Sequence, residues 1–342
     1  MINLLHIGLG AWGPGLARNL AKVKGAKLVS LCDQREDTYE KVSSQFPGIQ
    51  FSKNYEEFLE DGQIDAVSIA TPAHTHFRIA REFLQKGKHV LVEKPLAMTT
   101  QESHELVKIA QDMNLILMVG HVFLFNPAVR KLKEYYQSGV LGDVYYLYSQ
   151  RLNLGKVRQD VDALWNFAPH DISIMTYLLD RPVETVSARG LTMLQPGIAD
   201  VVFVQLMFQG GISGHIHVSW IDPNKVRKMT VVGSEKMVVY DDVDPDRKIQ
   251  IYDKGIDRKS LDTSFGQFDN FGTFQYLVRA GDLFIPKIDS AEPLFLECKH
   301  FVECIQNQQP PLTDGNHGLL VTQILEAASQ SMKQNGTVVS IQ

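Results

Sequence analysis

Short, uninterrupted apolar runs alternate with helical segments through the first third of the chain. The runs are rich in Val, Ile and Leu and continuous rather than alternating, which is typical of parallel strands covered on both faces. They lie at residues 4–7, 27–31, 66–69, 89–92 and 116–119, with a weaker run at 49–51. Segments with helical periodicity lie between most of them, at residues 16–23, 37–45, 77–85 and 103–111. This alternation predicts a doubly wound parallel sheet.

The pattern changes after Gly120. Residues 212–220 alternate strictly between apolar and polar positions, which is typical of a sheet with one covered face. Hairpin patterns join residues 201–208 to this run and join 228–232 to 236–240. Further elements are expected as helices at residues 127–137, 164–179, 293–306 and 317–334, and as strands at 143–152 and 337–341. Two stretches are expected to be loop-rich, at 241–247 and 255–290.

These elements predict an α/β protein of two domains. A length of 342 residues is about twice that of one compact domain. We expect the doubly wound parallel sheet at residues 1–121. An α+β domain with a large, mainly antiparallel open sheet is expected at residues 122–342.

Composition then limits the function. The 34 Lys and Arg residues oppose 39 Asp and Glu residues, for a net charge of −5, with no long block of one sign. No general surface for nucleic acid or anionic membrane is therefore expected. The three cysteines, Cys32, Cys298 and Cys304, are too few for a disulfide framework, and the last two are interpreted as core thiols. Without a spanning apolar run or a signal peptide pattern, the expected location is the cytoplasm.

A glycine motif directly follows the first expected strand and opens the first helix. Gly8, Gly10 and Gly13 form G-x-G-x-x-G, with Ala11 and Trp12 inside it. Such a turn lets the backbone approach a pyrophosphate at a helix N-terminus. The alternative is a structural glycine turn.

An acidic residue completes this pattern. Asp33 lies at the end of the second strand, 20 positions after Gly13, followed by Gln34 and Arg35. A carboxylate there accepts ribose hydroxyls and repels a 2′-phosphate, so NAD(H) is favoured over NADP(H). The guanidinium of Arg35 weakens that preference, because it could pair with a 2′-phosphate.

Two more strand ends carry candidate residues. Ligands of open α/β sheets bind outside the carboxyl ends of the strands. The strand ending at Ile69 leads into Ala70, Thr71, Pro72 and then His76, and the strand at 89–92 leads into Glu93, Lys94 and Pro95. A lysine here can bind a substrate oxygen. The alternatives are a helix-start turn for the first segment and a solvated surface lysine for the second.

Taken together, these motifs make the chain resemble the glucose–fructose oxidoreductase/inositol dehydrogenase (Gfo/Idh/MocA) family over its whole length. The resemblance rests on the glycine turn, the Thr71-Pro72…His76 segment, Glu93-Lys94-Pro95, His121 after Val119-Gly120, Phe125-Asn126-Pro127 and the helix near His170-Asp171. It implies a Rossmann domain that binds NAD(P), with Glu93, Lys94 and His121 near the cofactor. It also implies that Lys94 lies in the active site.

The resemblance further implies a catalytic histidine in the second domain. His170 matches the residue that takes the substrate hydroxyl proton, and Asn166 stands where the family usually has Asp. Residues four apart share a helix face, so both can point toward one substrate, with Trp165 beside them. An amide binds a hydroxyl but cannot act as a base, which puts the substrate class in doubt. The alternative for His170 is a helix-start histidine beside Pro169.

Other candidates carry weaker signals. Arg151 and Asn153, at the end of a strand, are candidates for binding an anionic substrate group, and the loop at residues 156–160 is a candidate cover for it. His215 and His217 share a strand face, but no third ligand is apparent, so no metal site is expected. The Phe-rich segment 265–274 is either a lid or part of the core.

The leading hypothesis is an NAD(H)-dependent oxidoreductase that transfers a hydride to or from a secondary alcohol of a sugar, cyclitol or nucleotide sugar. His170 would serve as general acid/base and Lys94 would polarise the reacting oxygen. Two alternatives keep the fold: a glycosidase that uses NAD transiently, and a dinucleotide-sensing regulator without turnover. Because open sheets commonly pair, a homodimer or homotetramer is expected.

Overall fold

The computed structural model describes residues 1–256 and 278–341. The contacts divide the chain into two compact units: Met1–Asn126 with Ala291–Glu326, and Pro127–Ser290 with Ala327–Gln342. The sequence placed all residues from 122 onward in the second domain. Residues 291–326 instead pack with the first unit, because the apolar face of a late helix completes the core on one side of the parallel sheet.

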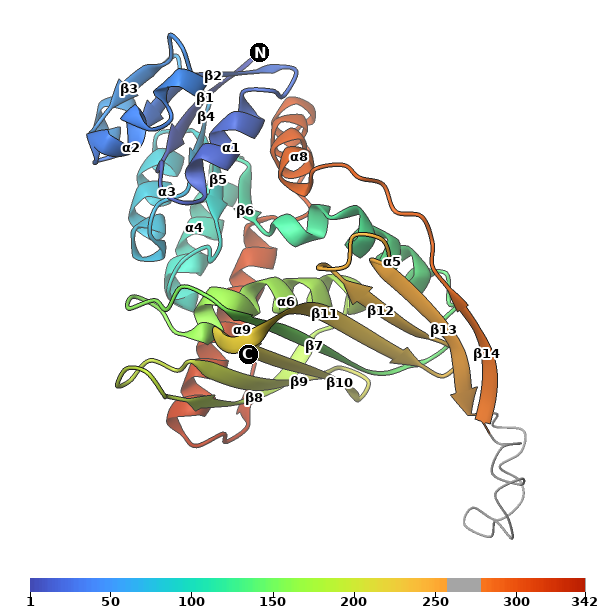
Figure 1. Ribbon diagram of the computed structural model, residues 1–342. Helices are drawn as coiled ribbons and strands as arrows, with labels where there is room; N and C mark the ends of the chain where they lie inside the picture. The colour runs from blue at the N-terminus through green and yellow to red at the C-terminus, as the bar shows by residue number, and fades with distance from the viewer. Residues whose placement is uncertain (257–277, 342) are drawn as a thin grey trace, which may run out of the picture. The chain divides into compact units, whose positions relative to one another are not determined.

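A six-stranded parallel sheet forms the centre of the first unit, in the order β3-β2-β1-β4-β5-β6 (Figure 1). The strands are β1 (Ile2–Ile7), β2 (Ala26–Cys32), β3 (Gln50–Ser52), β4 (Ala66–Ile69), β5 (His89–Glu93) and β6 (Leu117–Gly120). This order confirms the predicted Rossmann-like sheet, including the weak strand near residue 50. All the strand pairs are parallel, so their carboxyl ends share one edge.

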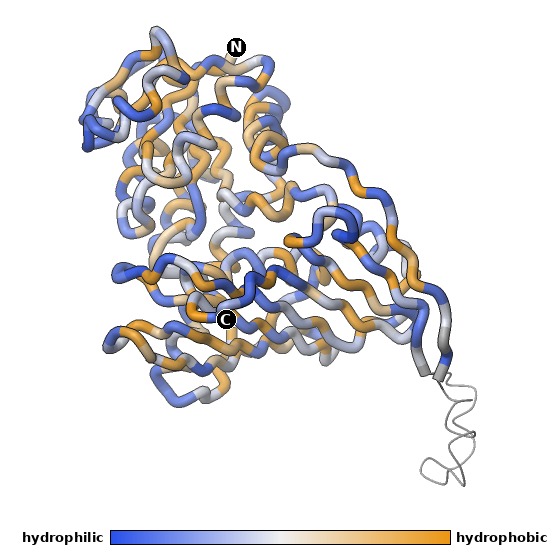
Figure 2. The backbone as a smooth tube through the Cα atoms, in the orientation of Figure 1, coloured by the Kyte–Doolittle hydropathy of each residue, from blue (hydrophilic) through white to orange (hydrophobic). Residues whose placement is uncertain are grey.

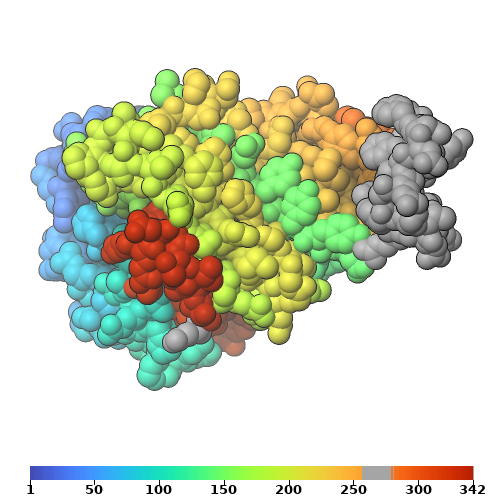
Figure 3. Space-filling model, turned by 90° about the horizontal axis from the view of Figure 1, so that it is seen from below, coloured from blue at the N-terminus to red at the C-terminus, as the bar shows by residue number. Residues whose placement is uncertain are grey.

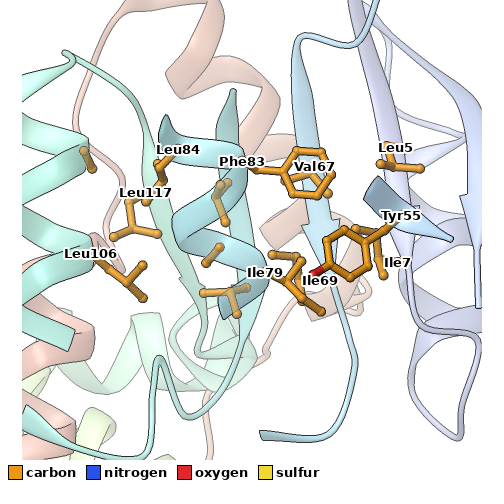
Figure 4. Close-up of a cluster of buried hydrophobic side chains, with 14 of the residues drawn as sticks. Leu5, Ile7, Tyr55, Val67, Ile69, Ile79, Phe83, Leu84, Leu106 and Leu117 are labelled. Carbon is orange, nitrogen blue, oxygen red and sulfur yellow. The ribbon is translucent and has the colours of Figure 1, made fainter. Parts of the chain in front are cut away.

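Helices cover both faces of this sheet. They are α1 (Gly13–Leu20), α2 (Glu36–Glu40), α3 (His76–Gln85), α4 (Thr100–Asp112) and α8 (Pro293–Asn307), together with the first part of α9 (Gly315–Lys333). On one face, Leu5 and Ile7 of β1 pack in a cluster with Phe83 of α3 (Figure 4). On the other face, Leu4 packs in a cluster that includes Phe301 of α8. Figure 2 shows the hydrophobic strands running inside this unit and the hydrophilic connections outside. The helix expected at 37–45 is split into α2 and a 3₁₀ turn at Ser43–Gln45.

The second unit is built on a nine-stranded sheet, in the order β14-β13-β12-β11-β7-β10-β9-β8-β15. Its strands are β7 (Val144–Leu154), β8 (Val183–Leu191), β9 (Val201–Phe208), β10 (Ile212–Ser219), β11 (Ile221–Gly233), β12 (Met237–Asp241), β13 (Ile249–Ile256), β14 (Val278–Phe284) and β15 (Val339–Ser340). β7 and β10 pair in parallel, and the other described pairs are antiparallel, as predicted. The sequence did not predict β8, β13 or β14, and the segment 265–274 lies outside the described residues.

The helices α5 (Pro127–Gln137) and α6 (Ala163–Leu179) pack on this sheet, and the last part of α9 joins them, since Ala188 N of β8 donates to Ser331 Oγ. α6 contacts β7, β9 and β10, and it carries the candidate residues of the second unit. The C-terminal segment, red in Figure 3, lies beside chain coloured yellow-green, in agreement with the pairing of β15 with β8. No helix in the described part of the chain is long and apolar enough to cross a membrane.

Candidate active site

The glycine turn leads from β1 into α1 at the carboxyl edge of the parallel sheet. Gly8 has a φ of +98°, and a side chain on Gly13 would meet the Gly8 carbonyl oxygen at 1.8 Å, so both positions require glycine. A side chain on Gly10 would meet nothing within 4 Å, which leaves this part of the turn open to a ligand. No side chain of the described residues caps the N-terminus of α1 at Trp12. The dipole of the helix and the backbone N–H of Gly13 at its first position therefore fit a dinucleotide pyrophosphate.

The His6 side chain holds the glycine turn through the Gly8 carbonyl. This residue was not identified from the sequence. It is fully buried in β1, with Nε2 2.9 Å from the Gly8 carbonyl oxygen and Nδ1 3.2 Å from the Ser68 hydroxyl. Burial lowers the pKa of His6 to about 4, so the ring is neutral. Nε2–H therefore donates to Gly8 and Nδ1 accepts from Ser68. The position of His6 inside an apolar strand is the sequence feature that could have identified it.

Asp33 follows β2 and holds two loops by their backbone. Its Oδ2 accepts a hydrogen bond from Leu9 N at 2.7 Å, and its Oδ1 accepts one from Arg35 N at 2.9 Å. Each carboxylate oxygen has a second lone pair, so both can also accept ribose hydroxyls. The Arg35 guanidinium is exposed, with Nε 3.8 Å from Asp33 Oδ1. Ala11, Trp12 and Gln34 are exposed on the same edge.

The loop after β4 is joined to the loop after β5 through His76. Its ring nitrogens lie 2.7 Å from the Pro95 carbonyl oxygen and 2.9 Å from that of Thr71, and the residue is 1% exposed. Burial lowers the pKa of His76, so the ring is neutral and its single N–H donates to one of the two carbonyl oxygens. The near-complete burial of the side chain argues against the predicted direct contact of His76 with the cofactor. The side chain instead shapes the loop of Ala70, Thr71 and Pro72.

Lys94 directly follows β5 on the same edge of the sheet. It is partly exposed. Burial lowers the pKa values of His76 and His121, and the nearby charge of Lys94 lowers them further. The same charge opposes the effect of burial on the pKa of Glu93, so the ammonium acts on all three side chains. Burial nevertheless raises the pKa of Glu93 to about 7. Glu93 Oε2 accepts from Lys94 N at 3.2 Å, and the Trp12 indole also donates to this carboxyl.

Two groups from the end of the chain lie behind this edge. The ring of His317, in α9, meets the His121 ring edge-on at 5.2 Å between centroids. Glu297, in α8, is fully buried, and its carboxyl interacts with that of Glu93. Sequence reasoning missed both, because it assigned these helices to the second domain. For Glu297, the sequence feature that could have identified it is a glutamate on the apolar face of the helix expected at residues 293–306.

In the second unit, α6 is anchored at its start. The Asp162 side chain accepts a hydrogen bond from Trp165 N at 3.0 Å and so caps the helix. Trp165 Nε1 donates to Ser329 Oγ at 2.9 Å, and Ala163 N donates to the Ala199 carbonyl at 2.9 Å. These contacts hold the first turn in place.

Asn166 and His170 lie one helical turn apart on α6. Both are partly exposed, as is Trp165, whereas Ala168 and Ile172 are buried. Because α6 is continuous from Ala163 to Leu179, Asn166 and His170 share one helix face, as their spacing predicts. A neutral imidazole on such a face can accept a proton and return it.

Arg151 does not reach toward solvent. Its Nε donates to Asp171 Oδ2 at 2.7 Å and its Nη2 to Oδ1 at 3.3 Å, and the two side chains are 6% and 4% exposed. This bidentate ion pair ties β7 to α6 beside His170 and argues against the predicted contact with substrate. Asn153 is partly exposed near the end of β7. The loop after it is held within the unit, since Gln195 donates to the Arg158 carbonyl.

His215 and His217 lie on one face of β10, and Phe203 of β9 lies directly across from His217. The Phe203 ring stacks on His217 at 4.4 Å and on His215 at 6.5 Å between centroids. Among residues 1–256 and 278–341, no group of three His, Cys, Asp or Glu side chains is arranged to hold a metal ion.

Comparison with known proteins places this geometry in a family. A model described as "Oxidoreductase family, NAD-binding Rossmann fold" matches residues 2–121, and a model described as "GFO/IDH/MocA C-terminal domain" matches residues 129–239. The chain is 26% identical over 348 residues to the scyllo-inositol 2-dehydrogenase (NAD(+)) of Bacillus subtilis (strain 168), covering 98% of this chain and 95% of that protein. It is 27% identical over 250 residues to the UDP-N-acetylglucosamine 3-dehydrogenase of Acidithiobacillus ferrooxidans, covering 73% and 76%.

A solved structure agrees over nearly the full length. The crystal structure of a putative oxidoreductase from Magnetospirillum magnetotacticum MS-1 superposes with a TM-score of 0.79 at 27% identity, covering 95% of this chain and 99% of that one. The two family models together match more than half of the chain. The chain therefore belongs to the Gfo/Idh/MocA family of NAD-binding oxidoreductases.

Proposed function

We propose that this oxidoreductase interconverts a secondary alcohol and a ketone on a sugar, cyclitol or nucleotide sugar, with NAD(H) as the preferred cofactor. The observation that carries the proposal is the position of Lys94. It follows β5 on the sheet edge that also bears the open glycine turn and Asp33. The names of two relatives, an inositol dehydrogenase and a nucleotide-sugar dehydrogenase, supply the substrate classes.

The residues of the first unit fit the cofactor. Gly8, Gly10 and Gly13 would hold the pyrophosphate at the start of α1, and Asp33 would accept the ribose hydroxyls. Bound NAD⁺ supplies the acceptor for the hydride that leaves the substrate carbon. The Lys94 ammonium donates a hydrogen bond to the reacting oxygen and stabilises the negative charge that develops there.

His170 and its helix neighbours act on the same hydroxyl. When the substrate carbon gives up its hydride, the imidazole of His170 would accept the hydroxyl proton, so that a C=O bond can form. In the reverse direction, His170 returns that proton to the ketone oxygen. Asn166 orients the ring by binding a neighbouring hydroxyl, and Trp165 flanks it, held by Ser329. Asn153 contributes a further polar contact.

The test is a screen for NADH formation. Purified protein with NAD⁺ is mixed with a panel of cyclitols, free sugars and nucleotide sugars, and absorbance by NADH is followed. The proposal predicts that one class gives NADH and ketone in equal amounts. A substrate that is cleaved without net NADH would identify a glycosidase, and NAD binding without any turnover would identify a regulator. Either result would overturn the proposal.

The outer face of the second sheet supports a homo-oligomer, which we propose as a dimer or tetramer. Tyr146 and Tyr148 of β7 are 45% and 38% exposed, and Phe203 of β9 is 37% exposed; β10 lies between these two strands. An aromatic patch of this kind is typical of a protein interface. Light scattering at several concentrations tests it, with Tyr148→Glu expected to favour the monomer. The three free, buried cysteines are consistent with a reducing cytoplasm.

A further inference from the structure

Two carboxyl groups are buried together directly behind Lys94. Glu297 of α8 is fully buried, and both of its carboxyl oxygens lack a hydrogen-bond partner among the described residues. Glu93 Oε1 is also buried without a described partner, although Oε2 accepts from Lys94 N. We call Glu93 and Glu297 the acid pair. The two groups interact electrostatically, although they belong to segments some 200 residues apart.

Such an arrangement is costly if both groups are ionised. An ionised carboxylate in a protein interior costs several kcal/mol unless it is paired and hydrogen-bonded. Two carboxylates in contact add repulsion, so one of them keeps a proton. Burial, reinforced by the charge of Glu93, raises the pKa of Glu297 well above its ordinary value. Glu93 accepts from Lys94 N and from the Trp12 indole, donors that stabilise an ionised carboxylate, whereas Glu297 is fully buried and has no described donor. Glu297 is thus the partner that keeps the proton, and it thereby gains an O–H donor.

Among the described residues, no cation is recorded as acting on Glu297. Burial lowers the pKa of His317 to about 4 and that of His121 well below its ordinary value, so both rings are neutral. Lys94 and Trp12 act on Glu93, and the buried Cys298 thiol lies next to Glu297 in the chain. The nearby Glu292 is already occupied, because it accepts from Asn19 and forms an ion pair with Arg18 at 2.6 Å. Lys94 is the cation that acts on the acid pair, and it does so through Glu93.

We propose that Glu297 is a positioning residue for Lys94: as a neutral carboxylic acid it donates its hydroxyl hydrogen to the Glu93 carboxylate, and the single negative charge of the acid pair faces the Lys94 ammonium. The shared proton gives a hydrogen-bond partner to Glu93 Oε1 and to one carboxyl oxygen of Glu297. It also holds Glu93 as an ionised acceptor oriented by the Trp12 indole. The effect on Lys94 chemistry rests on the proposed function, whereas the shared proton does not.

The first experiment measures the proton itself. A protonated carboxyl has an infrared C=O band that an ionised carboxylate lacks. Wild-type protein without substrate, at a pH well above the Glu93 pKa of about 7, is compared with Glu297→Gln and with Glu303→Gln, a matched control on the exposed side of α8. We expect one band in the wild type and in the control, and its loss in Glu297→Gln. Absence of the band from the wild type, or its full persistence in Glu297→Gln, would overturn the proposal.

The second experiment separates hydrogen bonding from packing. Glu297→Gln keeps an N–H donor for Glu93, whereas Glu297→Met has similar size and no donor. Without a donor the pKa of Glu93 rises further, so the acid limb of the pH profile of kcat/KM should move up by about one unit in Glu297→Met. Glu297→Gln should restore the wild-type limb. If the acid limb of the pH profile lay at the same pH in the wild type, Glu297→Met and Glu297→Gln, the positioning role of Glu297 would be contradicted.

The two experiments fail independently. If the protein forms no NADH with any substrate, the proposed function fails, while the infrared band still decides whether the acid pair shares a proton. If Glu297→Met does not fold, the infrared comparison of wild type with Glu297→Gln still decides it.

Discussion

The two units both bury a carboxylate beside a candidate catalytic residue, but they neutralise it differently. In the second unit, Asp171 adjoins His170 and is held by the Arg151 guanidinium through two hydrogen bonds. In the first unit, Glu93 adjoins Lys94 and has another carboxyl, that of Glu297, as its buried neighbour. A guanidinium stays charged at any physiological pH, whereas a shared proton can leave.

This difference separates a fixed support from a titratable one. The ion pair joins β7 to α6 and sets where His170 stands, regardless of pH. The acid pair sets the charge next to Lys94 and depends on pH. Four predictions test this contrast, from the largest expected effect to the smallest.

Removing either candidate catalytic side chain should have the largest effect. Lys94→Ala and His170→Ala should each lower kcat by about 10²- to 10⁴-fold, because a positioned proton-transfer group contributes that much. NADH binding, followed by fluorescence, should survive both changes. Lys108→Ala and His104→Ala, at exposed positions on α4, are the controls. A variant with unchanged kcat removes that residue from the mechanism.

Breaking the ion pair should chiefly affect stability. Arg151→Ala leaves Asp171 as an uncompensated buried charge, which should lower the free energy of unfolding by about 3–5 kcal/mol. Urea denaturation, followed by the fluorescence of Trp220 in this unit, measures it. Arg158→Ala removes an exposed pair with Asp160 and should cost less than about 1 kcal/mol. Equal losses in the two variants would show that the buried pair is not a support.

The acid pair should make stability depend on pH. The folded-state pKa values of Glu93 and Glu297 are raised, so their contribution is full at low pH and is lost as pH rises through those values. Between about pH 5 and pH 9, the wild type should lose stability more steeply than Glu297→Gln, by up to about 1.4 kcal/mol per pH unit. Parallel curves would mean that Glu297 is not protonated in the folded protein.

Asp33→Asn should give the smallest of the four effects. The amide keeps an oxygen to accept from Leu9 N, but it loses the charge that repels a 2′-phosphate. The preference for NADH over NADPH, as a ratio of dissociation constants, should fall about tenfold. An unchanged ratio would show that Asp33 does not select the cofactor.

Sequence alone predicted the parallel sheet because its strands are apolar throughout, as burial on both faces requires. It missed β8 and β13, whose polar and glycine positions leave no clear alternation and whose pairing depends on distant strands. The glycine turn, Asp33 and Lys94 could be proposed as site residues from the sequence because each lies at a strand end. The sequence did not reveal that Asp171 pairs with Arg151 or that Glu297 interacts with Glu93, because tertiary packing alone brings these residues together.

The most direct test of the account is the amount of NADH formed per substrate molecule by the wild type and by Lys94→Ala. With a cyclitol, sugar or nucleotide sugar that the wild type accepts, we predict one NADH for each ketone formed. The variant should bind NADH normally but turn over at least about 100-fold more slowly. Ketone formation at the wild-type rate in Lys94→Ala, or substrate consumption without net NADH, would contradict the account.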